Sequence, residues 1–143
     1  MNNHEKLSQA WVQDMLAQPL LARLATSNPI TLQPHVVPVW FAWDGEAVLV
    51  SAFSSTRKVR EVIQNKRISI LVDTGNPGEA TRGILFEGYA ELIQDSAQVA
   101  VLARQIYTRY SPGGILDAAA ESWLIDPENR IIRLKPEKIY TWG

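Results

Sequence analysis

The chain has 143 residues, a formal net charge of −1 and no cysteine. This length predicts one domain, residues 1–143, that is large enough to bury a hydrophobic core. The near-neutral charge argues against a nucleic-acid partner, and the lack of cysteine excludes disulfides, thiolate metal sites and cysteine nucleophiles.

The N-terminal segment predicts a helix rather than a leader or an anchor. Residues 1–20 contain Glu5 and Asp14 and no long apolar run, and nowhere do about 18 apolar residues follow one another. We therefore expect no signal peptide, no membrane association and a cytoplasmic location. Within residues 1–19, apolar side chains recur at helical spacing up to Pro19, which predicts a helix that packs on the rest of the domain.

Strand and turn signals alternate from there to the middle of the chain. Strands are expected at residues 21–26, 34–44 and 47–52, and the Asp44-Gly45 pair between the last two is a hairpin signal. Ser55 or Thr56 then predicts the start of a short helix that runs to about Gln64. Its inward-facing residues are expected to be Val59, Val62 and Ile63.

The rest of the chain predicts four more strands and two helices. The strands are expected at 67–73, 84–93, 130–135 and 138–142, and the helices at 95–110 and 115–124. Asp95 followed by Gln98 resembles a capping box at the start of the first of these helices. Hairpins interrupted by single helices favour a mainly β, α+β fold. We predict an antiparallel barrel of about six to seven strands with peripheral helices.

The strand at residues 34–44 is apolar on both faces, whereas a sheet with one solvated face should alternate apolar and polar residues. One face carries Val37, Val39, Phe41 and Trp43, and the other carries Val36, Pro38, Trp40 and Ala42. The first face is expected to pack inside the barrel. The second is covered by a partner subunit, a flat cofactor or the chain's own helices, and we favour a homodimer interface. Pro38 predicts a sheet edge or a bulge.

A basic segment at the start of the short helix is the strongest local signal for a ligand. Five of the 14 Lys and Arg residues fall within residues 57–67, opposed there only by Glu61. Three hydroxyl residues, Ser54, Ser55 and Thr56, lead into Arg57 and Lys58. A helix start at this point offers free N–H groups. Guanidinium and ammonium groups both bind phosphate, so the segment predicts a phosphate site. The alternative is a solvated basic helix face.

Six segments between Leu21 and Trp142 carry a family resemblance. They are Ala22-Arg23-Leu24-Ala25-Thr26, Pro34-His35-Val36-Val37-Pro38-Val39-Trp40-Phe41, Thr56-Arg57-Lys58-Val59-Arg60, Arg67-Ile68-Ser69-Ile70-Leu71-Val72-Asp73, Phe86-Glu87-Gly88-Tyr89-Ala90-Glu91-Leu92 and Lys135-Pro136-Glu137-Lys138-Ile139-Tyr140-Thr141-Trp142. In this order and spacing they resemble the pyridoxamine-phosphate-oxidase-like flavin-binding superfamily, the split β-barrel group.

The resemblance implies a split β-barrel homodimer with a cofactor, FMN or a deazaflavin, at each of two subunit-interface sites. Its cofactor-binding residues would be Val37, Pro38, Val39 and Trp40 beside the isoalloxazine ring, Ser51 and Ala52 near the ribityl chain, and Thr56, Arg57 and Lys58 on the phosphate. The helix-start argument adds the hydroxyl of Ser55 to the phosphate site. The resemblance also implies that Trp142 contacts the flavin from the other subunit.

Two departures from the vitamin B6 oxidases of this superfamily change the expected substrate. Those oxidases continue past the tryptophan into an Arg-x-His segment that binds pyridoxal, whereas Gly143 is the last residue here. They also place a basic residue late in the second strand, where this chain has Trp40 and Phe41. We therefore do not expect pyridoxamine phosphate to be the substrate. The run from His35 to Phe41 looks more like the subgroup that includes deazaflavin-dependent reductases.

The favoured function is an FMN-dependent oxidoreductase that acts on an unidentified small molecule. A flavin supplies the hydride chemistry itself, which suits a sequence without an evident acid–base constellation or a predicted metal ligand. The alternatives are a reductase that uses a deazaflavin, and a flavin- or haem-binding protein without turnover. His35 would be the axial ligand of a haem, although a histidine at a strand start is more often structural.

Overall fold

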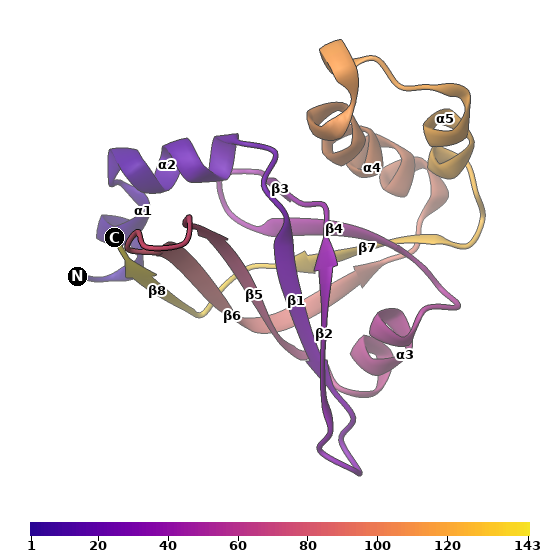
Figure 1. The fold of residues 1–143 in the computed structure, drawn as a ribbon. Coiled ribbons are helices and arrows are strands. Elements are labelled where there is room, and N and C mark those ends of the chain that lie inside the picture. Colours follow the sequence, from indigo (N-terminus) through magenta and orange to yellow (C-terminus); the bar gives the residue numbers. More distant parts are fainter.

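The computed structural model describes all of residues 1–143, with eight strands in one antiparallel sheet and helices around it (Figure 1). The strands are β1 (Ala22–Ser27), β2 (Pro34–Val39), β3 (Ala42–Trp43), β4 (Val48–Phe53), β5 (Arg67–Thr74), β6 (Arg82–Ile93), β7 (Asn129–Leu134) and β8 (Lys138–Trp142). The helices are α1 (Asn3–Leu7), α2 (Ala10–Ala17), α3 (Arg57–Gln64), α4 (Ser96–Tyr110) and α5 (Ala118–Leu124), with a 3₁₀ turn, η1, at Pro112–Gly114.

The strand order is β2-β1-β5-β6-β7-β4-β3, and β8 pairs with β6 outside this path. β6 holds the sheet together because its twelve residues have three partners. It pairs with β5 over residues 82–89, with β8 over 83–87 and with β7 over 90–93. This arrangement confirms the predicted mainly β fold, an antiparallel split barrel with peripheral helices.

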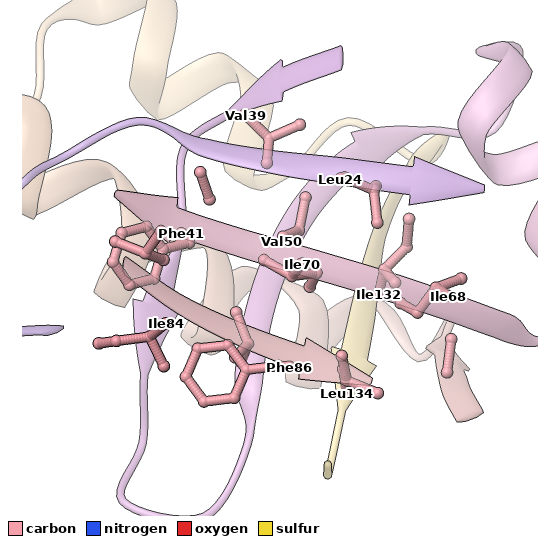
Figure 2. Close-up of a cluster of buried hydrophobic side chains, with 14 of the residues drawn as sticks. Leu24, Val39, Phe41, Val50, Ile68, Ile70, Ile84, Phe86, Ile132 and Leu134 are labelled. Atoms are coloured by element: carbon pink, nitrogen blue, oxygen red, sulfur yellow. The ribbon is translucent and has the colours of Figure 1, made fainter. Parts of the chain in front are cut away.

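The core of the barrel follows from the two-residue period of its strands. Leu24 of β1, Ile70 of β5 and Phe86 of β6 are completely buried, while the residues immediately before and after each of them face outward. Figure 2 shows these side chains pointing toward one another together with Val50 and Ile132 from the other half of the sheet.

The helices cover different parts of this sheet. α2 packs Val12, Met15 and Leu16 into the main core. α4 and α5 form a second apolar cluster against β4 and β7, which includes Ile106 of α4, Leu49 of β4 and Ile131 of β7. α3 follows β4 and lies on the opposite side of the molecule from the C-terminus (Figure 1). No helix combines the length and the apolar character that crossing a membrane requires.

The predicted strand at 34–44 is divided in two, which raises the strand count to eight. It leaves the sheet at Trp40 and Phe41 because side chains of α4 bind the Phe41 backbone. The Tyr110 hydroxyl lies 3.1 Å from the Phe41 N–H, and Arg109 Nε donates to the Phe41 carbonyl over 2.9 Å. β2 and β3 are both sheet edges, which confirms the position predicted for Pro38.

Three helix predictions need correction. The N-terminal helix is broken into α1 and α2, because Gln9 has an extended backbone and starts the second helix. The helix predicted at 115–124 begins at Ala118, where the Asp117 carboxylate caps the Ala120 N–H. Ile63 is 61% exposed, because Val59 and Val62 already fill the inward side of α3.

Candidate functional site

A cavity of about 320 Å³ lies where β2, β4, α3 and α4 meet. Its lining consists of Leu21, Pro38, Val39, Trp40, Ser51, Lys58, Ile106 and Tyr107. Ser51 faces this space because Val50 and Ala52, its neighbours on β4, point into the barrel core. The cavity therefore lies outside the barrel, between the sheet and its helices.

Five of the eleven predicted cofactor-binding residues line this cavity, and they come from separate elements. Pro38 and Val39 end β2, Trp40 follows it, Ser51 belongs to β4, and Lys58 lies in the first turn of α3. Two other predicted residues do not face the cavity. Val37 and Ala52 pack against the barrel core and do not belong to the cavity lining.

Lys58 is the only charged side chain in the cavity lining. Partial burial lowers its pKa from the ordinary value of a lysine. None of the ion pairs in the structure involves Lys58. An unpaired cation in a partly desolvated hollow is suited to bind an anionic group of a ligand.

The hydroxyl groups of Ser51 and Tyr107 form the polar wall of the cavity and lie 2.7 Å apart. The amide of Asn129, which is buried behind them, contacts both oxygens. Tyr107 is absent from the predicted site because it shares the apolar face of α4 with Val99, Ala103 and Ile106, where the sequence pattern indicates a core residue. The available signal was its hydroxyl, since a buried tyrosine needs a polar partner.

Aromatic rings form another side of the cavity. The rings of Trp40 and Tyr110 stack with centroids 4.8 Å apart and an angle of 4° between their planes. The edge of Tyr107 meets Trp40 at 6.1 Å. Burial raises the pKa of Tyr110. Its hydroxyl accepts from the Phe41 N–H and donates to the Leu20 carbonyl, so it holds the backbone at both residues.

Arg57 faces a different hollow from Lys58. It lines a polar cavity of about 300 Å³ with Arg60 and Glu61, and its Nε lies 3.3 Å from a Glu61 oxygen. Successive residues of a helix point about 100° apart, so two adjacent cations cannot share one narrow site without movement. The structure therefore does not bring Arg57 and Lys58 to the same cavity.

Ser55 and Thr56 lie just before α3 but neither lines the cavity. Thr56 occupies the N-cap position, yet its hydroxyl donates to the Phe53 carbonyl over 2.8 Å instead of capping the helix. The carbonyl of Ser55 accepts a hydrogen bond from Arg60. The side chain of Ser55 makes no hydrogen bond within the chain and is available to a ligand.

Glu61 anchors the α3 side of this region. It is 6% exposed, accepts a 2.7 Å hydrogen bond from Thr26 of β1 and pairs with Arg57. The Thr26 hydroxyl and the Arg57 guanidinium hold the pKa of Glu61 below its ordinary value in spite of burial. His35 Nδ1 lies 3.9 Å from the same carboxylate, is buried and makes no hydrogen bond.

Trp142 lies far from the cavity of its own chain. It ends β8 near the N-terminal helices, opposite α3 (Figure 1). Its indole ring covers Gly83 of β6, where a Cβ atom would overlap the ring. A role for Trp142 at this site therefore requires a second subunit.

Known proteins share the fold of this chain. The family model described as Pyridoxamine 5'-phosphate oxidase matches residues 9–143. None of the curated proteins matches the sequence. Three similar solved structures are a conserved hypothetical protein of Mycobacterium tuberculosis, an F420 reductase and the haem storage protein HutZ of Vibrio cholerae.

The similarity to these structures extends over nearly whole chains. The mycobacterial protein is 23% identical with a TM-score of 0.79, and the alignment covers 95% of this chain and 84% of that one. The F420 reductase is 26% identical with a TM-score of 0.69 and coverages of 90% and 94%. HutZ is 18% identical with a TM-score of 0.73 and coverages of 98% and 94%.

Proposed function

Because this chain belongs to the pyridoxamine 5'-phosphate oxidase family, we propose that it is an FMN-binding oxidoreductase that acts on an unidentified small molecule. One observation carries the proposal: Pro38, Val39, Trp40, Ser51 and Lys58, which the sequence predicts as flavin ligands, line a single cavity. When bound, FMN would supply the hydride chemistry. The chain's own residues would bind it, orient it and keep water from it.

The chemistry of the cavity lining fits the three parts of FMN. The apolar and aromatic residues at the end of β2 suit the flat ring. The hydroxyl oxygens of Ser51 and Tyr107 suit the polyol chain, and the cation of Lys58 suits the phosphate. Arg57 and the hydroxyls of Ser55 and Thr56 would join Lys58 on the phosphate after a change of rotamer, since these residues surround the start of α3.

We also propose that the protein is a homodimer, paired through the outer face of the sheet. Strand register places one row of residues across five strands, namely Pro38, Arg23, Leu71, Leu85 and Tyr140. Val36, in the neighbouring row, is 64% exposed, so the chain's own helices do not cover this face. Apolar side chains on this face lie beside the Arg23–Asp73 ion pair, and an exposed face of this mixed kind is suited to a subunit interface.

The same face carries Trp142. Gly83 pairs with Trp142 on one side and with Asp73 on the other, in the row next to Leu71 and Leu85. Trp142 and Pro38 therefore lie on one face, in neighbouring rows, on strands β8 and β2 at its opposite edges. A two-fold axis through this face would bring Trp142 of one subunit toward the cavity of its partner.

A deazaflavin reductase is the second candidate. The observation in its favour is the F420 reductase structure, which is 26% identical over 90% of this chain. Haem is a weaker fit, because His35, the predicted axial ligand, lies outside the cavity and faces Glu61. FMN remains the primary proposal because the cavity combines a hydroxyl wall with a single cation.

The test is an absorption spectrum of the freshly purified protein followed by titration with FMN and riboflavin. We expect flavin bands, or binding of added FMN with quenched fluorescence, and much weaker binding of riboflavin because it lacks the phosphate. A deazaflavin band would select the second candidate, and a Soret band would select haem. Equal affinity for FMN and riboflavin would contradict the proposed phosphate site.

A further inference from the structure

A closed ring of three hydrogen bonds stands behind one wall of the cavity. Asn129 Nδ2 lies 3.2 Å from the Tyr107 hydroxyl, which lies 2.7 Å from Ser51 Oγ, which in turn lies 2.8 Å from Asn129 Oδ1. Ser51 and Tyr107 face the cavity, whereas Asn129 is 2% exposed and does not line it.

The carbonyl of Trp123 determines the direction of this ring. It lies 2.9 Å from Asn129 Nδ2, and only the amide nitrogen can donate to a carbonyl, so the Asn129 side chain has one orientation. Asn129 Oδ1 is then an acceptor for Ser51, whose single hydroxyl hydrogen is used in that bond. The hydrogen between Ser51 and Tyr107 must therefore come from Tyr107.

We propose that Asn129 is a positioning residue that makes the Ser51 and Tyr107 wall a hydrogen-bond acceptor for the bound flavin. Both hydroxyl hydrogens are used inside the ring, so only oxygen lone pairs face the cavity. The wall recognises an O–H or N–H group of the ligand, while Lys58, a donor only, recognises an anionic group. This inference rests on the proposed flavin function and adds to it the polarity that the ligand must present.

The experiment titrates the full-length protein, by flavin fluorescence, with FMN and four analogues that each lack one donor hydrogen. These are the 2′-, 3′- and 4′-deoxyribityl forms and N3-methyl-FMN. We expect one analogue to bind wild type about 10-fold more weakly than FMN, as one lost hydrogen bond requires. Either S51A or Y107F should remove the oxygen that accepts this hydrogen bond. In that variant the ratio of the two dissociation constants, analogue over FMN, should fall to about 1. S122A, an exposed serine of α5, serves as the control and should keep the wild-type ratio.

Asn129→Ala separates positioning from a structural role. Without Asn129 the Ser51 hydroxyl is free to donate into the cavity. The ratio of dissociation constants, sensitive analogue over FMN, should therefore fall although the hydroxyls of Ser51 and Tyr107 both remain. A merely structural role would weaken both ligands equally and leave the ratio unchanged. If this buried substitution prevents folding, the S51A and Y107F ratios decide the question alone.

Two results would overturn the inference while leaving the proposed function intact. In the first, all four analogues bind wild type as tightly as FMN. In the second, the penalty of the sensitive analogue survives in S51A and in Y107F. Failure of wild type to bind FMN at all would instead contradict the proposed function, and the inference would fall with it.

Discussion

Lys58 and Arg57 are adjacent in the basic segment but their side chains face different cavities. Lys58 enters the cavity with Trp40 and Ser51, where burial lowers its pKa. Arg57 is instead held by the buried carboxylate of Glu61. The predicted phosphate site therefore depends first on Lys58, with Arg57 as a second contact that must leave Glu61.

Replacing Lys58 by alanine should weaken FMN binding about 10- to 100-fold, because a hydrogen bond to a charged group contributes roughly 1.5–3 kcal/mol. Riboflavin binding should change little. Fluorescence titration of both ligands measures this. Arg57→Ala should show a loss of the same kind, and Lys66→Ala, an exposed lysine outside the cavity, is the matched control. An equal loss of riboflavin affinity would place Lys58 away from the phosphate.

Gly83 offers a way to move Trp142 without removing it. A methyl group at Gly83 would overlap the indole ring, so Gly83→Ala should displace Trp142 and weaken FMN binding by a factor of about 3 to 10, as the loss of one aromatic contact would. Removing Trp142 should have a similar effect. In a Trp142→Ala background, Gly83→Ala should then have no further effect on affinity. Additive losses would show that Gly83 acts by another route.

At the scale of elements, α3 is attached to the barrel by Val59 and Val62, which pack into the core, and by one buried carboxylate. Glu61 joins α3 to Thr26 of β1 and lies beside His35 of β2. Because α3 carries both Arg57 and Lys58, this attachment also sets where the cations of the proposed phosphate site lie.

The stabilisation from Glu61 should disappear in acid. Its pKa is lower in the folded than in the unfolded chain, so the unfolded chain binds the extra proton as the pH falls. The contribution is complete above about pH 4.5 and is lost as the pH falls through the folded pKa. Urea unfolding of wild type and Glu61→Gln should differ more at about pH 7 than at about pH 3.5.

The control for this measurement is Glu137→Gln, an exposed carboxylate without an ion pair. It should leave the pH dependence of unfolding unchanged. A difference between wild type and Glu61→Gln that stays constant with pH would contradict the proposed charge interaction, and would indicate that only the shape of the side chain matters.

For the whole molecule, the exposed outer face of the sheet predicts a dimer. Wild type should sediment at micromolar concentration with twice the 16.0 kDa mass of one chain. Leu85→Asp places a charge in the middle of this face, since Leu85 pairs with Leu71 on β5 and with Tyr140 on β8. We expect this variant to be monomeric and, lacking the partner's tryptophan, to bind FMN about 10-fold or more weakly.

Val101→Asp is the control for the dimer, because Val101 is an exposed apolar residue that lies on α4, away from this face. It should remain dimeric. A clean wild-type monomer that still binds FMN would contradict both the interface and the role of Trp142.

The sequence by itself determined most elements of this fold, because their signals are local. Apolar runs bounded by turn residues mark seven strand regions, and cap residues mark the starts of α3 and α4. The break at Trp40 and Phe41 is not local. It is made by Arg109 and Tyr110, which lie nearly 70 residues further along the chain and bind the backbone there.

For the site, the sequence determined the residue types at the cavity, since the apolar β2 segment and the basic start of α3 are both visible in it. Only the tertiary structure decided how they are used. The turn of α3 sends Lys58 and Arg57 to different hollows. Packing of α4 on β4 makes Tyr107 a cavity wall, and Asn129, 78 residues from Ser51, orients that wall. Contacts at such separations depend on packing and leave no periodic signal in the sequence.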